Sequence, residues 1–245
     1  MNSLPLHAAG HHLDGSGRSV LDRVVSSYTY SVRGLAYARR GGSGRTRSAL
    51  VVAMPDTPGA SPLSSAMDEV SDVVALLRDT EVLVSSGATR TAVLKSLPHH
   101  SIAHFACHAV GDPVNAGLGR LLLHDHDSSA LTVEALSRLD LGHVELAFLS
   151  ACHTSETAEW LADEAVHITA AFHLAGCRNV VGTITPVNST AARITAAVYD
   201  HLTSGGSTES RLSDIALALH HAVRLVRETF PAAPTTWAAS VHVGT

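Results

Sequence analysis

The chain has 245 residues, of which 45% are hydrophobic and 16% charged, with a formal net charge of −5. This length is enough for one large domain with a sizeable core. The scarcity of basic residues argues against nucleic acid or an anionic membrane surface as the main partner. No apolar run reaches the ~18–20 residues of a membrane helix. Three cysteines without paired spacing do not indicate a disulfide framework, and Met1–Gly17 carries no signal pattern. We therefore expect a soluble, cytoplasmic protein.

The first 47 residues are predicted to form an N-terminal arm. Within it, Val20–Ser26 has the pattern of a strand and Ser31–Arg40 that of a short amphipathic helix. The stretch Gly41–Gly44 is a flexible linker. We expect residues 1–47 to be an arm and residues 48–245 to be the main domain.

From Ser48 onward, strand and helix patterns alternate along the chain. Short apolar runs predict strands over Ala49–Met54, Glu81–Ser85, Ser101–His108, Leu118–His124 (a hairpin arm or edge strand), Val144–Cys152, Asn179–Ile184 and Trp237–Val243. Apolar residues at helical spacing predict helices over Ala66–Arg78, Thr89–Leu97, Thr132–Leu139, Ala162–Ala175, Ser189–Leu202 and Arg211–Phe230. The alternation predicts an α/β fold with a mostly parallel sheet and helices on both faces.

Two of these strands end in reactive side chains. Ile102–Ala109 carries His108, and Leu146–Thr154 carries Cys152. If the two strands are parallel neighbours, imidazole and thiol meet at the carboxyl edge of the sheet, where open α/β folds build their sites. A thiol beside an imidazole is the minimal set for a cysteine nucleophile. The backbone amides of Ala109 and Cys152 are the natural donors to an oxyanion, and no residue is indicated as the group that orients His108.

Other interpretations of these residues stay open. Cys152 could be a buried structural cysteine, and Cys107 alternates to the opposite face from His108, which favours the core. Ser150 lacks the glycine-flanked turn of a hydrolase nucleophile. A zinc site is a rival hypothesis, although there is no Cys-x-x-Cys motif; its ligands would come from His104, Cys107, His108, Cys152 and His153. We expect no metal and no cofactor.

Several segments, in order, resemble a known family. Ala103–Ala109, Leu149–Thr154, Asp163–Thr183 and Trp237–Gly244 resemble the signatures of the CHAT domain, a caspase-like cysteine peptidase domain of clan CD. Resemblance to the actinobacterial branch of that family lies in Leu4–Gly10 and Leu121–Asp125. The resemblance covers nearly the whole chain. It implies the caspase fold and a His-Cys dyad formed by His108 and Cys152.

This chain also departs from the family pattern. Ala109 follows the histidine where the family often has glycine, and His153 follows the cysteine in place of glutamate. The family's Leu-Trp-x-(Val/Ile)-x-Asp segment is Ile184–Ser189 here. Asn188 carries no charge, so a strong preference for Arg or Lys is not expected. The resemblance places the substrate pocket at Asp56, Ser150, Thr185 and Asn188.

Together these observations predict a cysteine endopeptidase that cleaves a protein or peptide partner, in a regulated response. The alternative is a catalytically silent or latent caspase-like module that acts by binding. Members of the family are often joined to tetratricopeptide repeats, which this sequence lacks, so an activating or sensor protein is expected to act in trans. Loops Ala109–Gly119 and Thr154–Leu161 are polar and flank the dyad, so we expect an activator to order them.

Overall fold

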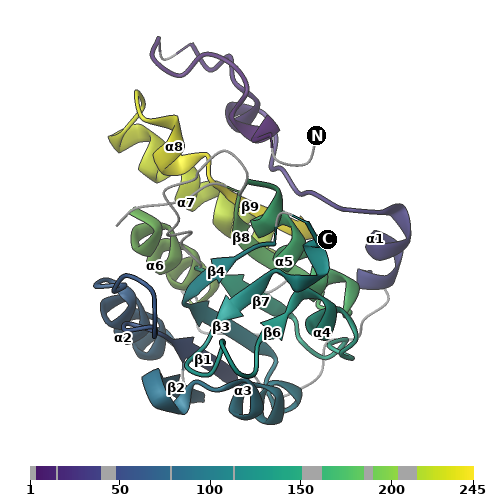
Figure 1. The fold of residues 1–245 in the computed structure, drawn as a ribbon. Coiled ribbons are helices and arrows are strands. Elements are labelled where there is room, and N and C mark those ends of the chain that lie inside the picture. Colours follow the sequence, from purple (N-terminus) through teal and green to yellow (C-terminus); the bar gives the residue numbers. More distant parts are fainter. Residues whose placement is uncertain are drawn as a thin grey trace.

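A six-stranded sheet forms the centre of the protein in the computed structural model (Figure 1). The structure describes residues 4–14, 16–39, 48–77, 79–112, 114–150, 162–184, 190–203 and 214–245. The strand order is β2-β1-β3-β7-β8-β9. The strands are β1 (Ala49–Ala53), β2 (Thr80–Val84), β3 (Ile102–Ala106), β7 (Leu146–Leu149), β8 (Asn179–Thr183) and β9 (Ser240–Gly244). All neighbours are parallel except β8 and β9, which confirms the predicted mostly parallel sheet.

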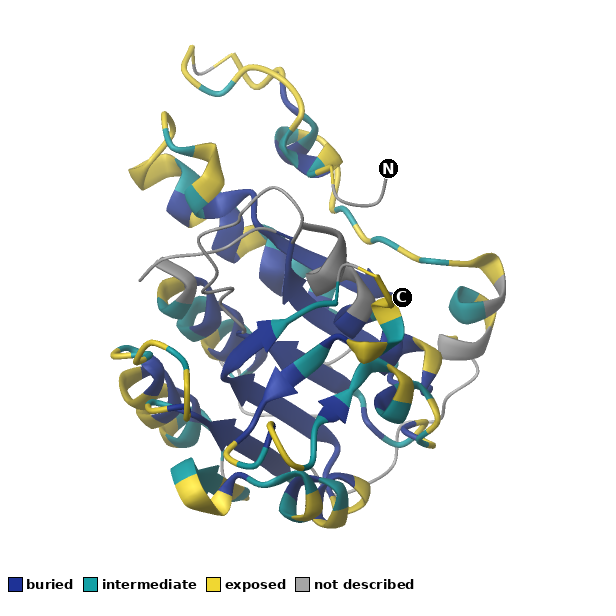
Figure 2. Cartoon of the chain, in the orientation of Figure 1, coloured by how far each residue is buried: buried dark blue, intermediate teal, exposed yellow. Residues whose placement is uncertain are grey.

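Helices cover both faces of this sheet, so its central strands are buried on both sides (Figure 2). Strand β1 is apolar and buried at every position, as expected for a strand between two helical layers. One face packs against α2 (Ala66–Leu76), α6 (Thr190–Thr203) and α7 (Ile215–Thr229). The other face packs against α3 (Arg90–Ser96), α4 (Val133–Ser137) and α5 (Ala162–Leu174). These six helices match the six that helical spacing predicts.

Local sequence signals explain where several helices begin and end. The side chains of Thr89 and Thr132 accept hydrogen bonds from the backbone amides of Ala92 and Ala135, which caps α3 and α4. Helix α5 is followed by Gly176 with φ of +107°, a conformation that favours glycine and ends the helix.

A second, three-stranded sheet packs on the face of the first that α3, α4 and α5 cover, and two predictions are wrong there. The predicted strand Ser101–His108 is interrupted at Cys107, and His108 begins β4 (His108–Val110). Strand β4 pairs with β5 (Arg120–Leu122), which pairs in turn with β6 (Leu131–Thr132). The Leu118–His124 segment was predicted as a hairpin arm or edge strand, and the edge assignment is wrong. Strand β5 lies in the middle because it has a partner on each side.

The arm, drawn in purple in Figure 1, runs along the β9 side of the body. The predicted strand over Val20–Ser26 is wrong: Val20–Asp22 is a 3-10 helix, and the residues after it extend without a partner strand. Val24 and Val25 stay exposed, so strand propensity alone does not suffice without a partner. Tyr28 forms a parallel bridge to Val243.

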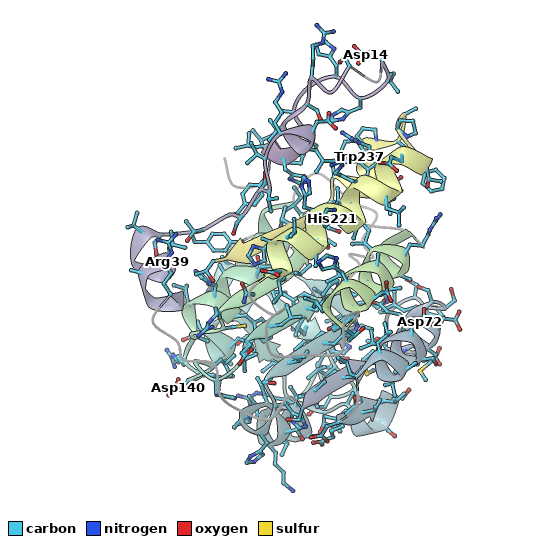
Figure 3. All side chains as sticks on the ribbon, turned by 180° about the vertical axis from the view of Figure 1, so that it is seen from behind. Asp14, Arg39, Asp72, Asp140, His221 and Trp237 are labelled. Carbon is cyan, nitrogen blue, oxygen red and sulfur yellow. The ribbon has the colours of Figure 1, made fainter. Side chains whose placement is uncertain are left out.

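Further contacts hold the arm to the body. The Asp22 carboxylate accepts a hydrogen bond from the Arg227 guanidinium at 2.6 Å, in an ion pair that is largely shielded from solvent. His12 packs edge-on against Trp237. Trp237 is labelled in Figure 3, which views the molecule from behind. The predicted helix over Ser31–Arg40 is confirmed as α1 (Val32–Ala38).

The last predicted strand begins later than expected. Trp237 ends a short helix, α8 (Pro234–Trp237), whose first residue is a proline, and its indole N–H donates to the Phe230 carbonyl. Proline at the start of a helical turn favours that turn over a strand. Strand β9 therefore starts at Ser240. None of the helices in the described ranges is long and apolar enough to cross a membrane.

Candidate active site

The two strands that carry the predicted dyad are parallel neighbours. Strands β3 and β7 pair in register from Ile102 opposite Leu146 to Phe105 opposite Leu149. Their carboxyl ends therefore meet at one edge of the sheet, as the sequence predicts. Cys152 follows the end of β7 by three residues, but residues 151–161 lie outside the described part of the chain.

His108 lies just past the end of β3, and a backbone carbonyl holds its ring. The side chain is fully buried, and its Nε2 is 2.6 Å from the carbonyl oxygen of Ser61. A carbonyl oxygen only accepts hydrogen bonds, so Nε2 carries the proton. In the neutral ring, Nδ1 is then the basic nitrogen. The Ser61 carbonyl is therefore the group that orients the His108 ring. The sequence did not indicate it, because every residue has a backbone carbonyl.

The loop over residues 55–65 presents that carbonyl in a fixed place. The Leu63 amide donates to the Pro55 carbonyl at 2.8 Å. His126 Nε2 donates to the Pro58 carbonyl at 2.9 Å, which ties the loop to the segment after β5. Prolines restrict the backbone further. These contacts fix the conformation of the loop. Asp56 is exposed at the start of the loop, near the carboxyl end of β1.

The other predicted site residues divide into described and undescribed ones. Ala109 is buried and pairs with Leu121 in the β4–β5 ladder. Ser150 is 7% exposed, and its hydroxyl donates to the Glu69 carboxylate at 2.9 Å. Thr185 and Asn188 lie outside the described residues. The structure therefore gathers His108, Ala109 and Ser150 at the ends of neighbouring strands.

The remaining cysteines are buried away from this chemistry. Cys107 is in the apolar core beside Phe105 and Ala109, as predicted. Burial raises the pKa of the Cys177 thiol to about 12, so it is not a thiolate at neutral pH. Within the described part of the chain, no three His, Cys, Asp or Glu side chains are grouped as metal ligands. The predicted zinc ligands Cys152 and His153 lie outside that part.

Solved structures with this arrangement of strands and helices define the fold class. The arginine-specific cysteine proteinase gingipain R superposes with a TM-score of 0.53 and 11% identity, over 80% of this chain and 46% of that chain. A complex of the pro- and mature domains of RgpB from Porphyromonas gingivalis gives a TM-score of 0.50 and 10% identity, over 80% and 47%. The separase of Saccharomyces cerevisiae, in complex with securin, gives a TM-score of 0.62 and 12% identity, over 99% and 15%. The fold is thus the caspase-like α/β fold.

The sequence profile of the CHAT domain matches residues 1–245. The chain therefore belongs to the CHAT domain family, which confirms the family resemblance. It spans about half the length of the gingipain chains and a small part of the separase chain. No curated protein matches the sequence.

Proposed function

We propose that this protein is a cysteine endopeptidase that cleaves a protein or peptide partner with a dyad of His108 and Cys152. The observation that supports the proposal best is the pairing of β3 with β7, together with the imidazole held by the Ser61 carbonyl. The family and the caspase-like fold agree with this chemistry.

The tautomer of His108 assigns a role to each ring nitrogen. Nδ1 takes the proton of the Cys152 thiol while Nε2–H stays bonded to Ser61. The thiolate attacks the scissile carbonyl carbon, and the amides of Ala109 and Cys152 stabilise the oxyanion. His108 then protonates the leaving amine, which leaves an acyl-enzyme. Water, deprotonated by the same nitrogen, hydrolyses the thioester and regenerates the thiol.

The same proposal extends to substrate and regulation. We place the substrate pocket at Asp56, Ser150, Thr185 and Asn188, around the carboxyl edge. The first of the two predicted loops, 109–119, begins later than expected, because Ala109 and Val110 belong to β4. An activating or sensor protein acting in trans orders the rest of that loop and loop 154–161, because both flank the dyad in the sequence. The cleavage would then take place only when that partner is bound.

A cysteine-reactive peptide probe, such as an acyloxymethyl ketone, tests the proposal directly. We expect the wild-type protein to be labelled and Cys152→Ala and His108→Ala to lose the label. Cys107→Ala, which changes a core cysteine, and His99→Ala, which changes an exposed histidine, are the matched controls and should keep it. Labelling that ignores both dyad substitutions, or no labelling even with cell extract added, would indicate a silent module that acts by binding.

A further inference from the structure

A buried carboxylate contacts Ser150, one of the candidate site residues. Glu69 is on α2 and only 5% exposed. Its Oε2 accepts a hydrogen bond from the Ser150 hydroxyl at 2.9 Å, and its Oε1 accepts one from the Thr195 hydroxyl at 2.8 Å. His104 Nε2 is 3.3 Å from the same Oε1. Four elements, α2, β3, the end of β7 and α6, therefore converge on one side chain.

The groups around Glu69 are buried and contact one another. His104 is fully buried, stacks on Phe148 with ring centroids 5.3 Å apart, and has Nδ1 at 3.3 Å from the Tyr199 hydroxyl. Burial, and in addition the negative charge of Glu69, raise the pKa of Tyr199 well above its ordinary value, so it remains a neutral phenol. A buried carboxylate is costly unless its partners compensate it. The proposed reaction uses none of these groups.

The position of Ser150 in the chain gives the network a link to the dyad. Ser150 is the residue after β7 and stands two residues before Cys152. The Glu69–Ser150 hydrogen bond therefore fixes the point where the chain leaves the sheet toward the nucleophile. On the other side, Ser61 holds His108. The acceptors of these two hydrogen bonds, the Ser61 carbonyl and the Glu69 carboxylate, belong to one continuous segment, the loop and helix over residues 55–76.

We propose that Glu69 is a positioning residue, which acts through Ser150 to fix the chain leading into Cys152 relative to His108. The inference rests on the proposed function, because it assigns a role within that dyad. Segment 55–76 then contacts the His108 ring through the Ser61 carbonyl and, through Glu69, contacts Ser150, the residue that follows β7. Small displacements of reacting groups cost rate steeply, about a hundredfold for roughly 1 Å. A purely structural Glu69 would affect stability but not the reactivity of the thiol.

The chain offers a matched control for this distinction. Ser150 and Thr195 both donate a hydroxyl hydrogen bond to the same carboxylate, and both are buried. Only Ser150 leads into Cys152, whereas Thr195 lies within α6. Ser150→Ala and Thr195→Val remove one hydrogen bond each from Glu69. If the two variants differ in thiol reactivity, the cause is therefore the place of Ser150 in the chain before Cys152, and not the loss of a buried hydrogen bond.

The experiment measures the rate at which iodoacetamide alkylates Cys152, from about pH 5 to about pH 9, by mass spectrometry of the peptide that contains it. We expect Ser150→Ala to lower the rate at neutral pH by about tenfold and to move the profile toward that of an ordinary thiol, as His108→Ala does. Ser150→Thr, which keeps the hydroxyl, should restore the wild-type profile. Thr195→Val should keep that profile even though its thermal midpoint falls.

Each outcome separates the two proposals. If Ser150→Ala and Thr195→Val change the profile equally, or neither changes it, Glu69 is structural and the inference is wrong. If His108→Ala itself leaves the profile of the wild-type thiol unchanged, the dyad of the proposed function is wrong. Should Ser150→Ala not fold, Glu69→Gln provides the test, because an amide keeps the size of the side chain but accepts through one oxygen only. Its alkylation rate should then lie between those of the wild type and His108→Ala, and a wild-type rate would overturn the inference.

Discussion

The carboxyl edge of the sheet and the β9 edge both bury histidines, but they surround them with different partners. At the carboxyl edge, His104 faces the Glu69 carboxylate and His108 faces the Ser61 carbonyl. Both partners are oxygens that accept hydrogen bonds, and they favour an N–H on the nitrogen that faces them.

At the β9 edge, the partners are neutral polar groups. His242 is bonded through Nδ1 to the Ser27 hydroxyl at 2.8 Å and through Nε2 to the Asn179 amide oxygen at 3.0 Å. His7 is bonded through Nδ1 to the Tyr28 hydroxyl at 2.9 Å. Burial lowers the pKa of His7 to about 4 and that of His242 to about 3. These imidazoles are uncharged at neutral pH and join the arm to the body.

The large number of histidines therefore does not indicate where the reactive site of this protein lies. The chain has 17 histidines, and burial is similar at the two edges. What distinguishes His104 from His7 and His242 is the carboxylate beside it, a contact that only the fold determines. Three predictions test this contrast, in order of decreasing effect.

The largest effect is expected from removing the charged partner at the carboxyl edge. Glu69→Ala leaves the Ser150 and Thr195 hydroxyls without their acceptor and removes the carboxylate beside His104, and should cost about 3–5 kcal/mol of unfolding free energy. The neighbouring Asp68→Ala changes an exposed carboxylate in the same helical turn and should cost about 1 kcal/mol or less. Denaturant unfolding measures both. Similar losses for the two variants would show that the buried network contributes little.

The next effect is a pH dependence that arises at the β9 edge. In the unfolded chain a histidine titrates near pH 6.5 (roughly its free value), whereas folded His7 and His242 resist protonation down to about 4 and about 3. Between those values the unfolded state binds more protons, so stability is full above about pH 6.5 and falls as pH decreases. His173, whose pKa burial also lowers, adds to the loss in the same direction.

Urea unfolding at about pH 7 and about pH 4.5 should therefore differ by on the order of a few kcal/mol. His7→Asn, which offers a side-chain nitrogen or oxygen near the Nδ1 position, should reduce that difference because it removes one titrating group. Equal stability at the two pH values would contradict the neutral assignment of these histidines.

The smallest effect is expected at the contact between the arm and α7. Asp22→Asn replaces the ion pair with Arg227 by a neutral hydrogen bond, and the loss of unfolding free energy should be about 1 kcal/mol because that hydrogen bond can remain. The Arg227 guanidinium, together with the Ser19 hydroxyl, holds the pKa of the Asp22 carboxyl well below its usual range. Limited proteolysis of the arm should become faster. The alkylation rate of Cys152 should stay unchanged, and a parallel loss there would mean that the two edges are coupled.

Much of the fold was predictable because its signals are local. The alternation of apolar strands and amphipathic helices predicted the parallel sheet, and the strand ends predicted that His108 would lie at the carboxyl edge. What sequence could not predict depends on contacts between distant segments. The Ser61 carbonyl has no residue signature, and the position of Glu69 on α2 is one of several acidic positions there. The segment Val20–Ser26 had strand-forming residues, but no partner strand reaches it.

The docking of the arm has a consequence for the order in which the molecule assembles. Ser27 binds His242, 215 residues further along the chain, and Tyr28 pairs with Val243. During biosynthesis the arm is made before β9, the strand that it binds. The arm can therefore dock only after the central sheet has formed. Its docking is a late, long-range step of the kind that slows folding. Attachment of the arm then requires that β9 has already joined the sheet.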